Sequence, residues 1–205
     1  MQTRIVATVI VVSALLLTVA AASAQDYITQ SIPRDAPYYT DLQRCYQLGL
    51  LEGYEDGTYR PDCILTRAEL WVAFNRLVDI ARMRGMTLTD DWDPIYATYA
   101  RGVRDHWGIM SFERLLKCGL IEDPPMPNVR GFDQGIKRIE FADIAVHTMR
   151  AYGMLAPDMR PAELAIGTDI MVRQSDGNFH MQQGMPRWEF AVAMDRLLNV
   201  MFPAG

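Results

Sequence analysis

Hydrophobic side chains recur at helical spacing in three stretches of the chain, and each stretch opens with the same motif. The motif is Arg-x-Glu followed at once by a large apolar residue, and it begins at Arg67, Arg138 and Arg187. The apolar residues at i, i+4 and i+7 are Leu70, Phe74 and Leu77 in the first stretch and Phe190, Met194 and Leu197 in the third. This spacing predicts three helices that each bury one face. Thr66 and Glu69 add the pattern of a capping box to the first of them.

A shorter amphipathic stretch precedes the motif in the first two copies. Apolar residues three positions apart run over 39–48 and 109–118, and each run ends at a glycine, Gly49 or Gly119, as is typical of a helix stop. In the third copy the candidate is 161–170. Each unit is therefore predicted to be a helix, a loop and a second helix. Because a unit of this size cannot bury its apolar face alone, we expect a mainly α fold in which the three second helices pack together.

A turn motif lies between the two helices of the first and third copies. Asp56-Gly57-Thr58-Tyr59 and Asp176-Gly177-Asn178-Phe179 each place the aromatic residue eight positions before the motif arginine. Asp-Gly favours a tight turn, and orienting a sugar hydroxyl is the alternative role for the aspartate. Tyr59 and Phe179 either fill the core between copies or stack on a sugar ring.

The amino terminus and the composition limit where the protein acts. Arg4 is followed by an uncharged apolar run that closes on Ala22-Ser23-Ala24. This pattern predicts a signal peptide over residues 1–24, with an uncleaved anchor as the alternative. The 205 residues have a hydrophobic fraction of 50% and a net charge of −5, which excludes a disordered chain and argues against a nucleic-acid binder. We therefore expect an exported, folded, acidic protein.

The first copy resembles the S-layer homology domain. The resemblance rests on the segment 53–61, Gly-Tyr-Glu-Asp-Gly-Thr-Tyr-Arg-Pro, and on Thr66-Arg67-Ala68-Glu69. The second copy keeps Asp105-His106-Trp107 and the Arg-x-Glu motif but has prolines where the turn should be, and the third is recognisable over 176–201. The resemblance implies repeats at 25–80, 105–153 and 154–205, with an insertion at 81–104, in a pseudo-threefold arrangement around a central three-helix bundle. It also implies that grooves between repeats bind a polysaccharide, often pyruvylated, at the cell-wall surface or in the periplasm of a bacterium.

The resemblance places the ligand-binding arginines at the starts of the second helices. An arginine at a helix amino terminus offers a cation and free N–H groups to a carboxylate, and Arg67, Arg187 and Arg138 hold that position. The alternative is that each arginine pairs locally or contacts carbonyl groups of a neighbouring repeat. The remaining candidate ligand-binding residues are Asp56, Gly57, Tyr59, Asp176, Gly177, Phe179 and, as a groove wall, Trp188. Because the chain is acidic, binding to an anionic polymer rests on these few arginines.

Two cysteines of the first copy are candidates for a disulfide bond. Cys45 and Cys63 fall in one copy, and an oxidising envelope permits a disulfide between them. Because the chain holds a third cysteine, Cys118, other pairings stay open.

Signatures of catalysis and metal binding are not found in the sequence. Neither Gly-x-Ser-x-Gly, His-Glu-x-x-His nor a phosphate loop occurs, and His106, His147 and His180 lack metal-ligand spacing. We therefore expect a non-catalytic envelope protein without cofactor or metal that binds wall polysaccharide or a peptidoglycan-linked polymer. The alternatives are a scaffold that joins other envelope proteins through decayed grooves and, less favoured, a wall-active enzyme that uses paired carboxylates.

Overall fold

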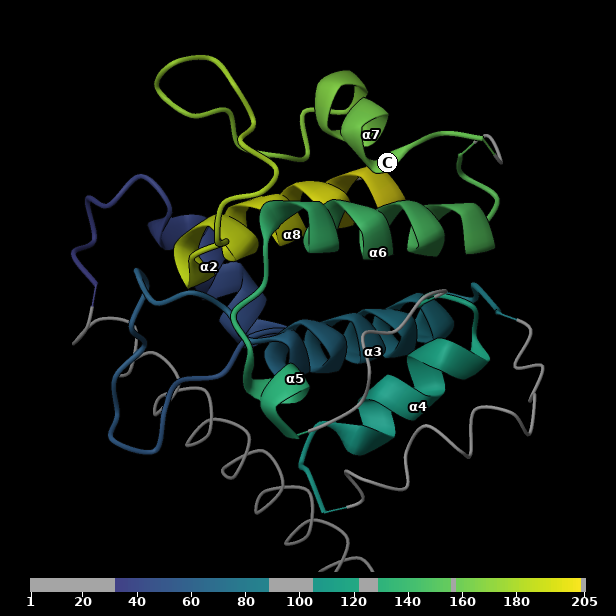
Figure 1. Ribbon diagram of the computed structural model, residues 1–205, viewed down its shortest axis with the longest axis horizontal. Helices are drawn as coiled ribbons and strands as arrows, with labels where there is room; N and C mark the ends of the chain where they lie inside the picture. The colour runs from purple at the N-terminus through teal and green to yellow at the C-terminus, as the bar shows by residue number, and fades with distance from the viewer. Residues whose placement is uncertain (1–31, 89–104, 122–128, 156–157, 204–205) are drawn as a thin grey trace, which may run out of the picture.

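The computed structural model describes residues 32–88, 105–121, 129–155 and 158–203, and in these ranges the fold is helical (Figure 1). Its helices are α2 (Tyr39–Gln47), α3 (Arg67–Met83), α4 (Ile109–Lys117), α5 (Val129–Asp133), α6 (Arg138–Ala151), α7 (Pro161–Gly167) and α8 (Arg187–Met201). The prediction of a mainly α fold is confirmed. The predicted signal peptide over 1–24 and residues 89–104 of the predicted insertion lie outside the described ranges.

The starts of the three long helices differ in one polar contact. At α3 the Thr66 side chain accepts a hydrogen bond from the Glu69 N–H, and Glu69 accepts one from the Thr66 N–H at 2.8 Å, so the capping box is complete. At α6 the Glu140 carboxylate accepts the N–H of the N-cap residue at 2.9 Å. At α8 the N-cap residue is Pro186, which has no N–H to donate. Glu189, the glutamate of the third motif, therefore lacks the N-cap N–H donor that Glu69 and Glu140 have.

Each short helix packs on a long helix of the preceding copy. Helix α4 lies against α3, α7 lies against α6, and α2 lies against α8. Because the first copy closes onto the third in this way, the contacts run round in a ring. This cyclic packing is in keeping with the predicted pseudo-threefold arrangement.

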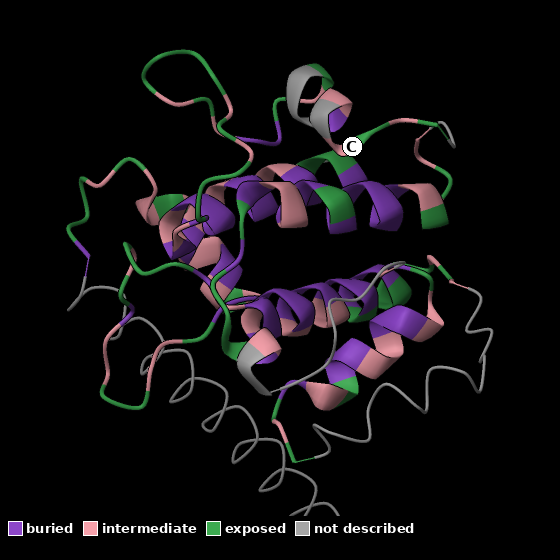
Figure 2. Ribbon diagram, in the orientation of Figure 1, coloured by how far each residue is buried: buried purple, intermediate pink, exposed green. Residues whose placement is uncertain are grey.

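The long helices meet through phenylalanine rings at the centre of the protein. The ring of Phe141 lies 5.7 Å from that of Phe74 and 5.6 Å from that of Phe190, both in edge-to-face geometry. All three side chains are completely buried. Buried residues, drawn in purple, run along α3, α6 and α8 (Figure 2). The apolar positions that the spacing assigned to the first and third helices are buried too: Leu70, Phe74, Leu77, Phe190, Met194 and Leu197.

Three equivalent residues, each three positions before a motif arginine, meet at the amino-terminal ends of the long helices. They are Ile64, Gly135 and Gly184, and backbone bridges in the same segments join the copies in pairs. A β-carbon added to Gly135 would lie 2.8 Å from Ile64 Cγ2, and one added to Gly184 would lie 3.0 Å from Ile64 Cδ1. One isoleucine therefore fills the space that two glycines leave.

Candidate functional site

The three motif arginines pair with the three motif glutamates in a closed ring. Arg67 pairs with Glu140 and Arg138 pairs with Glu189, both at 2.5 Å, while Arg187 pairs with Glu69. Each arginine thus contacts the glutamate of the following copy, and the third contacts that of the first. The Arg138 and Arg187 side chains are buried, and that of Arg67 is nearly so.

The backbone N–H groups of the three motif arginines also have hydrogen-bond acceptors within the protein. The Arg67 N–H donates to the Gln134 carbonyl at 2.9 Å, the Arg138 N–H to the Gln183 carbonyl, and the Arg187 N–H to the Cys63 carbonyl, both at 3.0 Å. These acceptors take the place that a carboxylate ligand would need. The contacts match the alternative in which the arginines pair with a neighbouring repeat. The ligand-binding role of Arg67, Arg138 and Arg187 stays a prediction.

The two Asp-Gly segments form the same tight turn. Gly57 and Gly177 have φ values of 79° and 80°, which a side chain with a β-carbon rarely adopts. The Asp56 carboxylate accepts hydrogen bonds from the Thr58 N–H and hydroxyl and from Arg60, and these lower its pKa to about 2.

In the third copy the corresponding turn is held by different partners. The Asp176 carboxylate accepts from the Asn178 N–H and side chain and contacts His180, which together lower its pKa to about 2. Both aspartates therefore stabilise turns, and a contact of either with a sugar stays a prediction.

The predicted aromatic residues differ in what they contact. Tyr59 is completely buried. Phe179 is partly buried beneath the Arg173 guanidinium, 4.4 Å from the ring centre, and Trp188 stacks on Tyr38 with ring centres 5.3 Å apart. Tyr59 therefore fills the core, while the other two rings already have protein partners.

Tyr59 gives a direct test of the core role. Its hydroxyl is buried and has no hydrogen-bond partner among the described residues, which costs free energy because the group has lost its water. We expect Tyr59→Phe to raise the free energy of unfolding by about 1 kcal/mol, measured by urea denaturation. Tyr54→Phe is the control, since its hydroxyl contacts Glu69. A loss of stability in Tyr59→Phe would contradict the core role.

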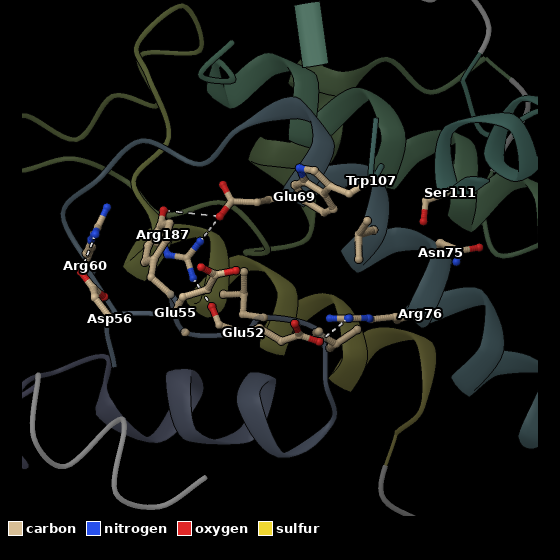
Figure 3. Close-up of a pocket in the computed structure, with 15 residues that line it drawn as sticks. Glu52, Glu55, Asp56, Arg60, Glu69, Asn75, Arg76, Trp107, Ser111 and Arg187 are labelled. Carbon is tan, nitrogen blue, oxygen red and sulfur yellow. Dashed lines mark hydrogen bonds and ion pairs between the residues drawn. The ribbon is translucent and has the colours of Figure 1, made fainter. Parts of the chain in front are cut away.

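A groove of about 870 Å³ lies on the first copy and also takes in residues from the start of the second copy and one arginine of the third (Figure 3). The residues after α2, the outer face of α3 and the start of α4 form its walls. Its lining residues are Leu50, Leu51, Glu52, Gly53, Tyr54, Glu55, Asp56, Arg60, Glu69, Val72, Asn75, Arg76, Trp107, Ser111 and Arg187. The structure thus brings together two of the predicted site residues, Asp56 and Arg187. Arg67 lines a smaller pocket of about 100 Å³ between the first and second copies.

The groove contains a residue to which the sequence analysis gave no role. The Trp107 side chain is on the wall formed by the second copy, and the residue is 60% exposed. The Asp105-His106-Trp107 segment marks the start of that copy in the sequence, but nothing local shows that its indole ring faces the first copy. Only the packing of α4 on α3 brings it there.

Cys45 and Cys63 do not form the disulfide that the sequence permitted. Both are free thiols, Cys45 buried and Cys63 exposed. The Cys45 thiol instead donates to the Ala191 carbonyl on α8, at 3.5 Å. Its position is set by the packing of α2 on α8, which directs it into the core, away from the exposed Cys63 loop.

Comparison with known proteins supports the assignment of the first copy. Residues 32–70 match the family model of the S-layer homology domain. The chain is also 30% identical, over 97 residues, to Cell surface glycoprotein 1 of Acetivibrio thermocellus. That match covers 47% of this chain and 4% of the relative. The S-layer homology domain is a non-catalytic cell-wall-binding module, and the family match links residues 32–70 of this chain to it.

Two further findings concern the described residues alone. None of their helices is both long enough and apolar enough to cross a membrane. Nor do they contain a group of three or more His, Cys, Asp or Glu side chains placed to hold a metal ion.

Proposed function

We propose that this protein is an exported, non-catalytic component of the bacterial cell envelope that binds a cell-wall polymer through the groove that its first copy forms with Trp107 of the second copy and Arg187 of the third. The match of residues 32–70 to a wall-binding domain supports this function. The observation that carries it to a particular site is the groove of about 870 Å³ with the exposed ring of Trp107 in its wall. An indole face in a concave, partly polar site suits a sugar ring, whose C–H face is apolar and whose rim carries hydroxyl groups.

The test is sedimentation of the purified protein with isolated cell walls. We expect the wild-type protein to sediment and Trp107→Ala to lose about tenfold or more in wall affinity, because truncating a central aromatic contact has large effects on binding. Met110→Ala is the matched control, since Met110 is a nearby apolar residue that is 78% exposed but does not line the groove. If the wild-type protein stays in solution with every wall preparation, the proposed function is wrong.

A second candidate is a scaffold that joins other envelope proteins. It is favoured by the ring of ion pairs, because all three motif arginines already have glutamate partners. It predicts that a protein partner co-purifies equally with wild type and Trp107→Ala while neither sediments with walls. The family resemblance also implies that the wall polymer is pyruvylated. This ligand is part of the wall-binding proposal and stays a prediction.

A further inference from the structure

The exposed ring of Trp107 is carried by a tight turn of the backbone. The Ile109 N–H donates to the His106 carbonyl at 3.0 Å, and the Gly108 N–H donates to the Nδ1 atom of the His106 side chain at 3.1 Å. Gly108 is buried, and a β-carbon added to it would lie 3.0 Å from the Cβ of Ala68 on α3. The backbone on both sides of the indole is therefore fixed relative to α3, which forms another wall of the groove.

The His106 imidazole is held at both of its nitrogen atoms. Because Nδ1 accepts from the Gly108 N–H, the neutral ring carries its proton on Nε2. Nε2 lies 3.1 Å from the Asp133 carboxylate at the end of α5, to which it donates a hydrogen bond. The imidazole also contacts the ring of Phe132, with centres 4.6 Å apart. Since the His106 side chain is only 7% exposed, these contacts fix its orientation.

The indole of Trp107 stacks on this fixed imidazole. The two ring centres are 5.6 Å apart, and the ring planes are inclined by 29°. Trp107 is nevertheless 60% exposed, so the imidazole covers one part of the indole and leaves the rest open to the groove. His106 itself does not line the groove, and any effect that it has on a ligand therefore passes through Trp107.

A ring that is ordered before binding gives a tighter complex than a ring that the ligand must order. An exposed side chain with no neighbour samples several rotamers, and fixing it on binding reduces the affinity. The imidazole restricts the indole in the free protein, so less rotamer freedom is left to lose. We expect this restriction to raise the wall affinity by about threefold to tenfold.

We propose that His106 is a positioning residue that holds the Trp107 indole in its ligand-binding orientation. This inference rests on the proposed function and adds an affinity-determining residue to that same groove. The simpler role, in which His106 only closes the turn before α4, needs the Nδ1 acceptor but not the ring. His106→Asn separates the two roles, because the asparagine Oδ1 can accept from the Gly108 N–H while no ring remains against the indole.

The first experiment measures the motion of the indole in the purified protein. The Trp107 indole N–H signal is identified by NMR in an isotope-labelled sample through its absence from Trp107→Ala, and its order parameter is measured. We expect a rigid value of about 0.85 in the wild-type protein and a value below about 0.6 in His106→Asn. His180→Asn, the control, makes the same change at a histidine that contacts Asp176 outside the groove, and it should leave the signal unchanged. An unchanged order parameter in His106→Asn would overturn the proposal.

The second experiment asks whether His106 affects binding through Trp107. Wall affinity is measured by sedimentation for the wild-type protein, His106→Asn, Trp107→Ala and the double variant. We expect His106→Asn to lose about threefold to tenfold in affinity and to cause no further loss once the indole is absent, because the two residues act as one unit. Equal losses in both backgrounds would show that His106 acts elsewhere and would overturn the proposal.

A second variant loosens the imidazole without changing His106. Asp133→Ala removes the partner of Nε2 at a side chain that is 59% exposed, so the fold should tolerate it. We expect it to lower both the order parameter of the indole and the wall affinity, by less than His106→Asn does. An indole as rigid as in the wild-type protein would show that the Asp133 contact does not hold the imidazole in place.

The positioning role and the proposed function fail in different ways. If the wild-type protein stays in solution with every wall preparation, the proposed function is wrong, and the order parameters still decide whether His106 fixes the indole. If the wild-type protein sediments and both His106→Asn and Asp133→Ala bind walls as tightly as it does, wall binding stands and the positioning role is rejected.

Discussion

Truncation of either partner in the Arg138–Glu189 pair is expected to lower the free energy of unfolding by about 3–5 kcal/mol. The two side chains are 1% and 2% exposed and lie 2.5 Å apart. Removing one leaves the other as an uncompensated charge in the core, which is the most costly outcome for a buried ion pair. The measurement is urea denaturation of Arg138→Ala and Glu189→Ala, followed by circular dichroism. Changes below about 1 kcal/mol in both variants would contradict it.

Two comparisons identify the cause of this loss. Arg160→Ala breaks an exposed pair with Glu163 and should change stability by no more than about 1 kcal/mol. Replacing both buried partners, as Arg138→Met with Glu189→Leu, should restore most of the loss, because the core then holds no charge at this place. A double variant as unstable as the singles would show that the pair itself, and not the orphaned charge, supplies the stability.

The pair also carries a pH dependence. Burial raises the pKa of Glu189 above its ordinary value of 4.5, in spite of the lowering effect of Arg138. The folded protein therefore binds this proton more tightly than the unfolded chain does. Stability from this group is full below pH 4.5 and is lost as the pH rises through the folded pKa. Glu189→Gln should remove that part of the pH profile.

Gly135→Ala is expected to lower the free energy of unfolding by about 1–3 kcal/mol through a collision with Ile64. The added β-carbon would lie 2.8 Å from Ile64 Cγ2, a distance at which one of the two groups must move. Gly184→Ala should cost less, since its nearest contact, at 3.0 Å, is the terminal Cδ1 of the same side chain. Neither glycine has a positive φ, so steric contact is the reason in both cases.

A double-mutant cycle separates the collision from other effects. In an Ile64→Ala background the space around Gly135 is open, so Gly135→Ala should become neutral or stabilising by up to about 1 kcal/mol, because alanine restricts the unfolded chain. The measurement is again urea denaturation, with the coupling between the two sites as the result. Additive effects would show that Ile64 does not fill the space of the missing side chains.

The local structure of each copy could be predicted from the sequence. The capping box of Thr66 and Glu69 and the Asp56-Gly57 turn involve residues within a few positions of each other. The spacing of Leu70, Phe74 and Leu77 fixes which face of α3 is apolar, and that face is buried. Such features depend on local hydrogen bonds and on helical periodicity, both of which are present in a short stretch of chain.

The candidate site could be predicted only in part. The positions of Arg67 and Arg187 at helix starts followed from the motif, and Asp56 and Arg187 do line one groove. The partners of the arginines did not follow, because Arg67 and Glu140 are 73 residues apart and Arg187 and Glu69 are 118 apart. Trp107 was missed for the same reason, since its wall belongs to another copy than the residues opposite it.

The sequence by itself determined the repeated helix-loop-helix units, their helix starts and turns, and the apolar faces that must be buried. The tertiary structure decided how those faces meet, and hence that each motif arginine is held by a glutamate of the next copy. It also decided that residues of the first copy lie in one groove with the ring of Trp107. The physical reason is that a helix face can be read from its own residues, whereas its partner depends on how all three copies fill one core.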